Sequence, residues 1–286
     1  MNPVPADAIA AIRVGDFQCY PISDGDHLYP RAALCGDDPE QAIGLPEQVL
    51  VPYTPLLVDT GSHRILIDTG AGPLAPSTGH LEDSLSRAGF QASDIDVVVL
   101  SHAHPDHIGG LAREDGTMRF PNARVLMSQR EYDFWHSADL RGRLGSGSVY
   151  GSPEIENLMG VWIDRYLPPV RDRLEWLADE TEIAPGIAAI DAPGHTPGHL
   201  GIAISSGTAS LLFAGDVLIM PNQVVRPDWT SNFDLDAQVL ISTRRRLLDR
   251  AATDRSIVFH YHFGEAGRFG RRGTQFEWER LSSPLS

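Results

Sequence analysis

Short apolar runs separated by turn residues dominate the first third of the chain. Residues 56–60 and 64–68 are apolar runs that flank the turn Gly61-Ser62-His63, which predicts a β-hairpin. Residues 95–100 are rich in Val and carry little polar alternation, so we expect an interior strand buried on both faces. Residues 12–20 predict one further strand near the start of the chain.

The second half again contains a predicted hairpin that ends in an Asp, formed by residues 200–204 and 210–216. Strands are predicted at residues 124–127, 187–190, 200–204, 210–216 and 257–259, and helices at residues 81–88, 129–135 and 235–252. Residues 27–51 and 137–160 show little periodicity, which indicates a long loop and a surface insertion that shape a pocket. Strands and helices mix throughout, so we expect one α+β domain over residues 1–286, with two packed sheets and outer helices.

Composition narrows the function classes. The 286 residues are 42% apolar and 21% charged, as in ordinary globular proteins, and the formal net charge is −15. That negative charge argues against nucleic acid or an anionic membrane surface as a partner, because both are polyanions. Without a long apolar run or a basic leader, a cytoplasmic location is expected, and Cys19 and Cys35 are interpreted as structural thiols.

Three of the eleven histidines fall within residues 102–107, beside Asp106. His102 and His104 would point to different faces of a helix, so their spacing suits a strand end that turns into a loop. Pro105 favours the same geometry because it restricts His104 to extended or turn conformations. Imidazole and carboxylate ligands without a thiolate suit an open catalytic site for zinc, manganese, iron or cobalt.

Four ligands so close in sequence cannot easily surround one ion. A natural division assigns His102 and His104 to one metal, and Asp106 and His107 to another. Further ligands are then needed from residues that also follow a predicted strand, because strand ends can meet at one sheet edge. Three residues qualify: His195, Asp216 and His260. The roles of His199 and His262 stay open, with His199 expected to support its turn.

The segment His102-Ala103-His104-Pro105-Asp106-His107 matches the His-x-His-x-Asp-His motif of the metallo-β-lactamase superfamily, which this chain resembles. The resemblance extends in family order to Asp68-Thr69-Gly70, Gly194 to His199, Ala214-Gly215-Asp216 and His260. It implies an αββα sandwich of two packed mixed β-sheets with outer helices. It also implies a dinuclear site, in which His102, His104 and His195 hold one divalent ion, Asp106, His107 and His260 hold the other, and Asp216 bridges them.

Two such ions, with zinc as the expected metal, would lower the pKa of a shared water and supply a bridging hydroxide near neutral pH. We expect that hydroxide to attack a small-molecule lactone or ester, with Asp106 and Asp216 as catalytic residues and a phosphotriester as a further option. The chain resembles the lactonase and organophosphate-hydrolase branch. Quorum-signal lactones are not expected, because Val217 follows Asp216 where such hydrolases often place Tyr.

Three alternatives stay open from the sequence. One is a mononuclear iron dioxygenase that acts on a persulfide, and another is a thioesterase of the glyoxalase II type. The third is a non-catalytic binding member of the fold. The expected partner is a small-molecule substrate, and the oligomeric state is open, with a homodimer as one option.

Overall fold

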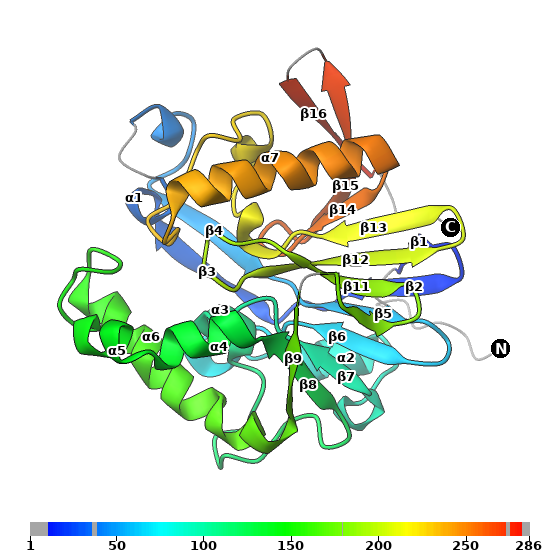
Figure 1. Cartoon of the computed structure of the whole chain (residues 1–286), viewed down its shortest axis with the longest axis horizontal. Helices are drawn as coiled ribbons and strands as arrows, with labels where there is room; N and C mark the ends of the chain where they lie inside the picture. Colours follow the sequence, from blue (N-terminus) through cyan, green and yellow to red (C-terminus); the bar gives the residue numbers. More distant parts are fainter. Residues whose placement is uncertain (1–10, 36–38, 179, 273–274, 282–286) are drawn as a thin grey trace.

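The computed structural model describes residues 11–35, 39–178, 180–272 and 275–281. Within these residues, two mixed β-sheets of seven strands each pack face to face, and helices cover their outer faces (Figure 1). A separate two-stranded sheet pairs β3 (Gly25–Pro30) with β4 (Gln48–Tyr53). The predicted αββα sandwich is therefore confirmed.

The first sheet comes from the N-terminal half of the chain. Its strands, in spatial order, are β1 (Ile12–Val14), β2 (Phe17–Pro21), β5 (Leu56–Asp59), β6 (Arg64–Ile67), β7 (Val97–Val99), β8 (Arg124–Ser128) and β9 (Leu174–Leu177). The predicted hairpin is the antiparallel pair β5–β6, whereas β6 to β9 run parallel to one another. Strand β7 is buried at every position, as its apolar composition predicts.

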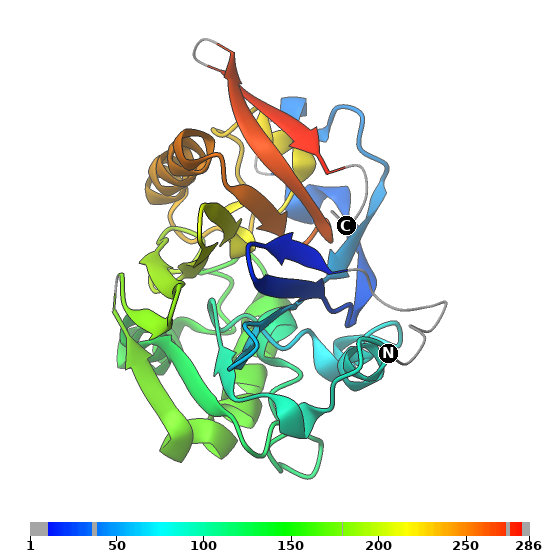
Figure 2. The same ribbon diagram turned by 90° about the vertical axis from the view of Figure 1, so that its right-hand side faces the viewer.

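The second sheet comes from the C-terminal half. Its strands, in spatial order, are β10 (Glu182–Ala184), β11 (Ile187–Asp191), β12 (Leu200–Ser206), β13 (Ala209–Phe213), β14 (Ile257–His260), β15 (Glu265–Arg272) and β16 (Gln275–Arg280). Only β13 and β14 pair in parallel, because α7 (Ala237–Asp254) connects them as a crossover. The β15–β16 hairpin projects at one end of the molecule in both views (Figures 1 and 2).

Three apolar clusters separate the layers. One lies between the two sheets and contains Val58 and Ile67 from the first and Ile202 and Phe259 from the second. Another lies beneath the first sheet, and the third lies between the second sheet and α7. The remaining helices are α1 (Arg31–Leu34), α2 (Leu81–Arg87), α3 (Pro105–Ile108), α4 (Gln129–His136), α5 (Ala138–Arg143) and α6 (Pro153–Tyr166).

Two segments that show little periodicity in the sequence contain regular elements. Residues 27–51 are not one long loop, because β3, α1, the 3₁₀ turn Pro39–Ala42 and β4 together occupy most of their described part. Their periodicity is weak since the β3–β4 pair stands apart from both large sheets and buries few of its side chains. Residues 137–160 contain α5 and the first half of α6, whose start is set by the Ser152 cap and Pro153.

Short 3₁₀ turns complete the chain: Pro39–Ala42, Gly72–Leu74, Ala92–Asp94, Pro168–Arg173, Gly215–Val217 and Pro221–Val224. Across the described residues, no helix combines the length and the apolar character that crossing a bilayer requires.

Candidate metal centre

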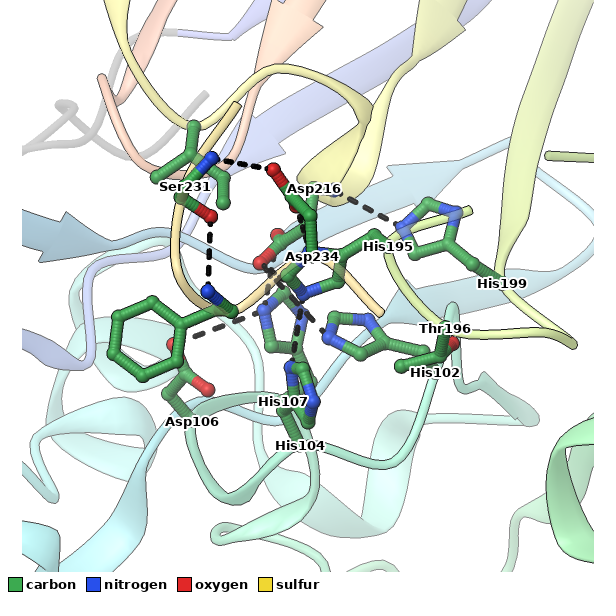
Figure 3. A network of polar contacts seen from close by, with 12 residues as sticks. His102, His104, Asp106, His107, His195, Thr196, His199, Asp216, Ser231 and Asp234 are labelled. Carbon is green, nitrogen blue, oxygen red and sulfur yellow. Dashed lines mark hydrogen bonds and ion pairs between the residues drawn. The ribbon is translucent and has the colours of Figure 1, made fainter. Parts of the chain in front are cut away.

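Seven histidine and aspartate side chains meet where the strand ends of the two sheets approach each other, and Figure 3 labels all of them except His262. They are His102, His104, Asp106, His107, His195, Asp216 and His262. The chain leaves β7 at Val99 and enters the short helix α3, so residues 102–107 cross from a strand end into a helix start. His104 has the extended conformation that Pro105 predicts (φ −67°, ψ 152°).

The first group contains His102, His104, His195 and Asp216, whose ligand atoms all lie within 4.8 Å of one another. His104 Nδ1 is 2.9 Å from His195 Nε2, which is 3.2 Å from Asp216 Oδ2. His102 Nε2 is 3.9 Å from the same carboxylate oxygen. Three imidazoles and one carboxylate thus converge, as the sequence predicts for these four residues.

The second group contains Asp106, His107 and His262. Asp106 Oδ2 lies 3.8 Å from His107 Nε2 and 3.6 Å from His262 Nε2. Asp216 contacts this group too, because its Oδ1 is 3.2 Å from His107 Nε2 and its Oδ2 is 3.1 Å from His262 Nε2. The Asp216 carboxylate therefore lies between the two groups, which is the position of a bridging ligand.

The structure does not bring His260 to this cluster, and His262 occupies the expected place instead. His260 is the last residue of β14, and its ring stacks on Phe263 at 4.5 Å and meets Trp278 edge-on at 4.6 Å. Burial lowers the pKa of His260 to about 3, so this ring is neutral. The expectation for His260 is corrected because alternation along β14 points it away from the inner face, which carries Phe259.

Hydrogen bonds from outside the cluster orient several ligand rings. His107 donates from Nδ1 to Asp68 (2.8 Å), and His195 donates from Nδ1 to Asp234 (2.7 Å). Each ring then presents its Nε2 to the cluster, an arrangement typical of metal-binding histidines. Asp68 belongs to a motif that the sequence singles out, whereas Asp234 lies on a loop with no distinctive pattern and sequence reasoning missed it.

His199 lies outside both ligand groups and contacts the backbone of Asp216. The backbone N–H of Asp216 donates to His199 Nε2 at 3.0 Å. Gly215 precedes Asp216 with φ +53°, and a Cβ there would lie 2.7 Å from the His199 ring. Only glycine lets the backbone pass so close to His199 in this conformation, and Asp216 is placed accordingly.

The cluster has the properties of a metal site. Within the described part of the chain, His102 Nε2, His107 Nε2 and Asp216 Oδ1 are buried without a hydrogen-bond partner, although all three face the cluster. Burial and neighbouring histidines hold the pKa of His102 and His104 well below its usual value, so both rings are neutral. Neutral imidazoles and a carboxylate fit divalent zinc, manganese, iron or cobalt.

A cavity of about 180 Å³ opens onto both groups. His104, Asp106, His195, Asp216 and His262 form its polar end. The rest of its lining is mostly apolar and comes from β3, α1, β4, the 3₁₀ turn Gly72–Leu74, α3, α6 and two loops: Tyr29, Pro30, Ala33, Leu34, Val51, Leu74, Pro105, Ile155, Leu158, Met159, Ile219 and Phe233. No Arg or Lys appears among these described lining residues. The pocket therefore suits an uncharged molecule with an apolar part.

Both a family model and individual known proteins match this chain. The model for the family described as the metallo-beta-lactamase superfamily matches residues 51–262. A Drosophila melanogaster protein named "Beta-lactamase-like protein 2 homolog" is 30% identical over 173 residues, covering 60% of this chain and 49% of that protein. The chain spans about half the length of the first curated relatives that it matches.

Two solved structures are similar over almost their full length. One, described as "AidC, a Dizinc Quorum-Quenching Lactonase", holds the product of its reaction and has a TM-score of 0.83 at 27% identity, covering 96% of this chain and 98% of its own. The other, described as "hydrolase AbOPH in beta lactamase superfamily", has a TM-score of 0.85 at 24% identity, with the same coverage of 96% and 98%. At that lower identity the likeness shows the fold alone.

Proposed function

Because this chain belongs to the metallo-β-lactamase superfamily, we propose that its cluster holds two divalent metal ions and that it hydrolyses a small, uncharged lactone or carboxylic ester. The observation that carries the proposal is the pairing of two ligand groups, joined by Asp216, with one shared apolar pocket. In this proposal His102, His104 and His195 hold one ion, and Asp106, His107 and His262 hold the other. Zinc is the proposed metal.

When bound, such ions lower the pKa of water and polarise the carbonyl of the substrate. The residues of the chain then perform the remaining tasks. The apolar wall of the pocket, which includes Met159 and Phe233, orients the alkyl part of the substrate and excludes bulk water. Asp106 faces the pocket with its side chain 15% exposed, so its carboxylate is placed to carry a proton to the leaving alkoxide.

The lining of the pocket separates the proposed substrates from two alternatives. Carboxylate-bearing β-lactams and anionic thioesters would place a negative charge against the apolar wall of the pocket, where no Arg or Lys stands among the described lining residues. A neutral lactone or ester brings no such charge. The similar AidC structure is that of a dizinc lactonase, which supports both the two ions and a lactone substrate.

The test compares two lactones that carry the same alkyl chain, one ending in a methyl group and one ending in a carboxylate. We expect kcat/KM to be about 100-fold higher for the neutral lactone, because an unpaired buried charge costs several kcal/mol. Metal content is measured on the same preparation by elemental analysis, and we expect two ions per chain.

Asp216→Asn is the matched control for the site. It keeps the size of the side chain but weakens the bridge, so both metal content and turnover should fall. Equal rates on both lactones would contradict the pocket argument. A preparation that holds two ions yet hydrolyses neither lactones nor esters nor phosphotriesters would overturn the proposed activity. One bound iron without zinc would favour the persulfide dioxygenase instead.

A further inference from the structure

One ligand ring has a partner that comes from the segment between α5 and α6. A hydrogen bond of 2.8 Å joins Tyr150 Oη to His104 Nε2. Both side chains are buried, and the opposite ring nitrogen, His104 Nδ1, faces the cluster 2.9 Å from His195 Nε2. The two nitrogens of His104 therefore have separate surroundings, one against a phenol and one toward the proposed ion.

The loop that carries Tyr150 is held by a buried carboxylate. Glu156, on the first turn of α6, accepts hydrogen bonds from the backbone N–H groups of Gly147 (2.7 Å), Val149 (2.6 Å) and Tyr150 (3.0 Å). Its side chain is fully buried. Three charge-assisted bonds to consecutive parts of one loop leave the loop little freedom, so the phenol is aimed at His104 by α6.

We propose that Tyr150 is a positioning residue for His104 and that Glu156 fixes Tyr150 in place. The phenol oxygen accepts a hydrogen bond from the N–H at His104 Nε2, so the proton stays on Nε2 and the lone pair of Nδ1 is free for the proposed ion. A neutral imidazole carries its proton on one nitrogen or the other, so a partner at Nε2 selects the form that binds through Nδ1. This inference rests on the metal centre of the proposed function.

The other ligand rings show why a partner is needed at this position. His107 and His195 each have a carboxylate behind them, Asp68 and Asp234. Glu131, which contacts the backbone next to His104, accepts hydrogen bonds from Ala103 N and Trp135 Nε1. For His104 the partner is Tyr150, and losing such a partner typically lowers metal affinity about 10- to 100-fold.

The test is Tyr150→Phe, which removes the hydroxyl and keeps the ring. Zinc affinity is measured by competition with a chromogenic chelator on the full chain. We expect one of the two ions to bind about 10- to 100-fold more weakly and the other to be unchanged. KM for the neutral lactone should stay constant while kcat falls, because the hydroxyl that Tyr150→Phe removes contacts His104 Nε2.

Tyr166→Phe is the control, since Tyr166 is a buried tyrosine at the end of α6 that stacks on Trp162. It should leave both affinities unchanged. Glu156→Gln should weaken the same ion as Tyr150→Phe, because it loosens the loop that carries the phenol. Equal zinc affinities in wild type and Tyr150→Phe would overturn the inference and leave the proposed function intact.

A second measurement does not depend on any variant. In the zinc-loaded wild-type chain, ¹⁵N-detected NMR should show the proton of His104 on Nε2. A proton on Nδ1 would overturn the inference. A wild-type chain that binds no divalent ion would overturn the proposed function and the inference together, so the two failures are distinguishable.

Discussion

His260 and His262 are two residues apart, yet they have opposite surroundings because β14 ends between them. His260 is the last strand residue and enters an aromatic environment that includes Phe263 and Trp278. His262 lies in the following turn, where its Nδ1 donates to the Pro52 carbonyl at 3.1 Å and its Nε2 faces Asp216. Strand alternation applies to the first histidine and no longer applies to the second.

This difference predicts opposite effects for two substitutions. His262→Ala should reduce metal content from two ions to about one per chain, because it removes a ligand of the second group. His260→Leu should leave both ions in place, because the His260 ring packs against Phe263 and Trp278 and belongs to neither ligand group. Elemental analysis of the two purified variants decides this, and loss of metal in His260→Leu alone would restore the assignment made from the sequence.

At the scale of elements, α4 joins the two loops that carry most of the ligands. Its buried Glu131 accepts hydrogen bonds from Ala103 N (3.0 Å) and Trp135 Nε1 (2.8 Å) through one carboxylate oxygen. The other oxygen accepts from Thr196 Oγ1 (2.7 Å) and Gly198 N (3.0 Å). One side chain therefore ties the loop of His102 and His104 to the loop of His195.

Replacing Glu131 by Gln should destabilise the protein by about 2–4 kcal/mol. The substitution turns one carboxylate oxygen into an NH₂ group, so the two donors that this oxygen accepts from lose their acceptor. Urea unfolding measures the change. The control is Glu175→Gln, which alters an exposed ion pair with Arg124 and should cost about 1 kcal/mol or less. Equal losses of stability for the two variants would show that the buried Glu131 contacts stabilise the fold no more than an exposed ion pair does.

At the scale of the whole molecule, the cluster lies on the seam between the two sheets. His102 to His107 follow β7 of the first sheet, whereas His195, Asp216 and His262 follow β11, β13 and β14 of the second. Ions held there would connect the two halves of the sandwich. The halves also share the central apolar cluster, which supports the proposal that residues 1–286 form one domain.

Removing the ions should therefore lower the melting temperature of the whole chain. An ion present at about 100 times its Kd stabilises the folded state by about 2.7 kcal/mol, and this contribution disappears on chelation. Calorimetry with and without a chelator measures the shift, and added zinc should reverse it. Asp216→Asn should respond to the chelator much less than wild type. An unchanged melting temperature after complete metal removal would contradict a connecting role.

The sequence by itself determined what depends on near neighbours along the chain. The spacing of His102, His104, Asp106 and His107 predicts a set of candidate metal ligands without reference to the fold. Pro105 sets the backbone conformation of His104. The apolar runs of β5, β6, β7 and β13 predicted their own burial. His195 and Asp216 were found because each follows a strand, and strand ends at one sheet edge meet in space.

Only the tertiary structure decided which side chains complete the site. His262 replaces His260 because the end of β14 is set by pairing with β15 and not by the local pattern. Tyr150 and Asp234 lie on loops without periodicity, and their contacts with His104 and His195 depend on how α6 and the 231–234 segment pack. Periodicity indicates which face of a helix or strand is buried. Whether residues far apart in the sequence meet depends on how the layers pack, and the spacing of residues along the chain does not determine that packing.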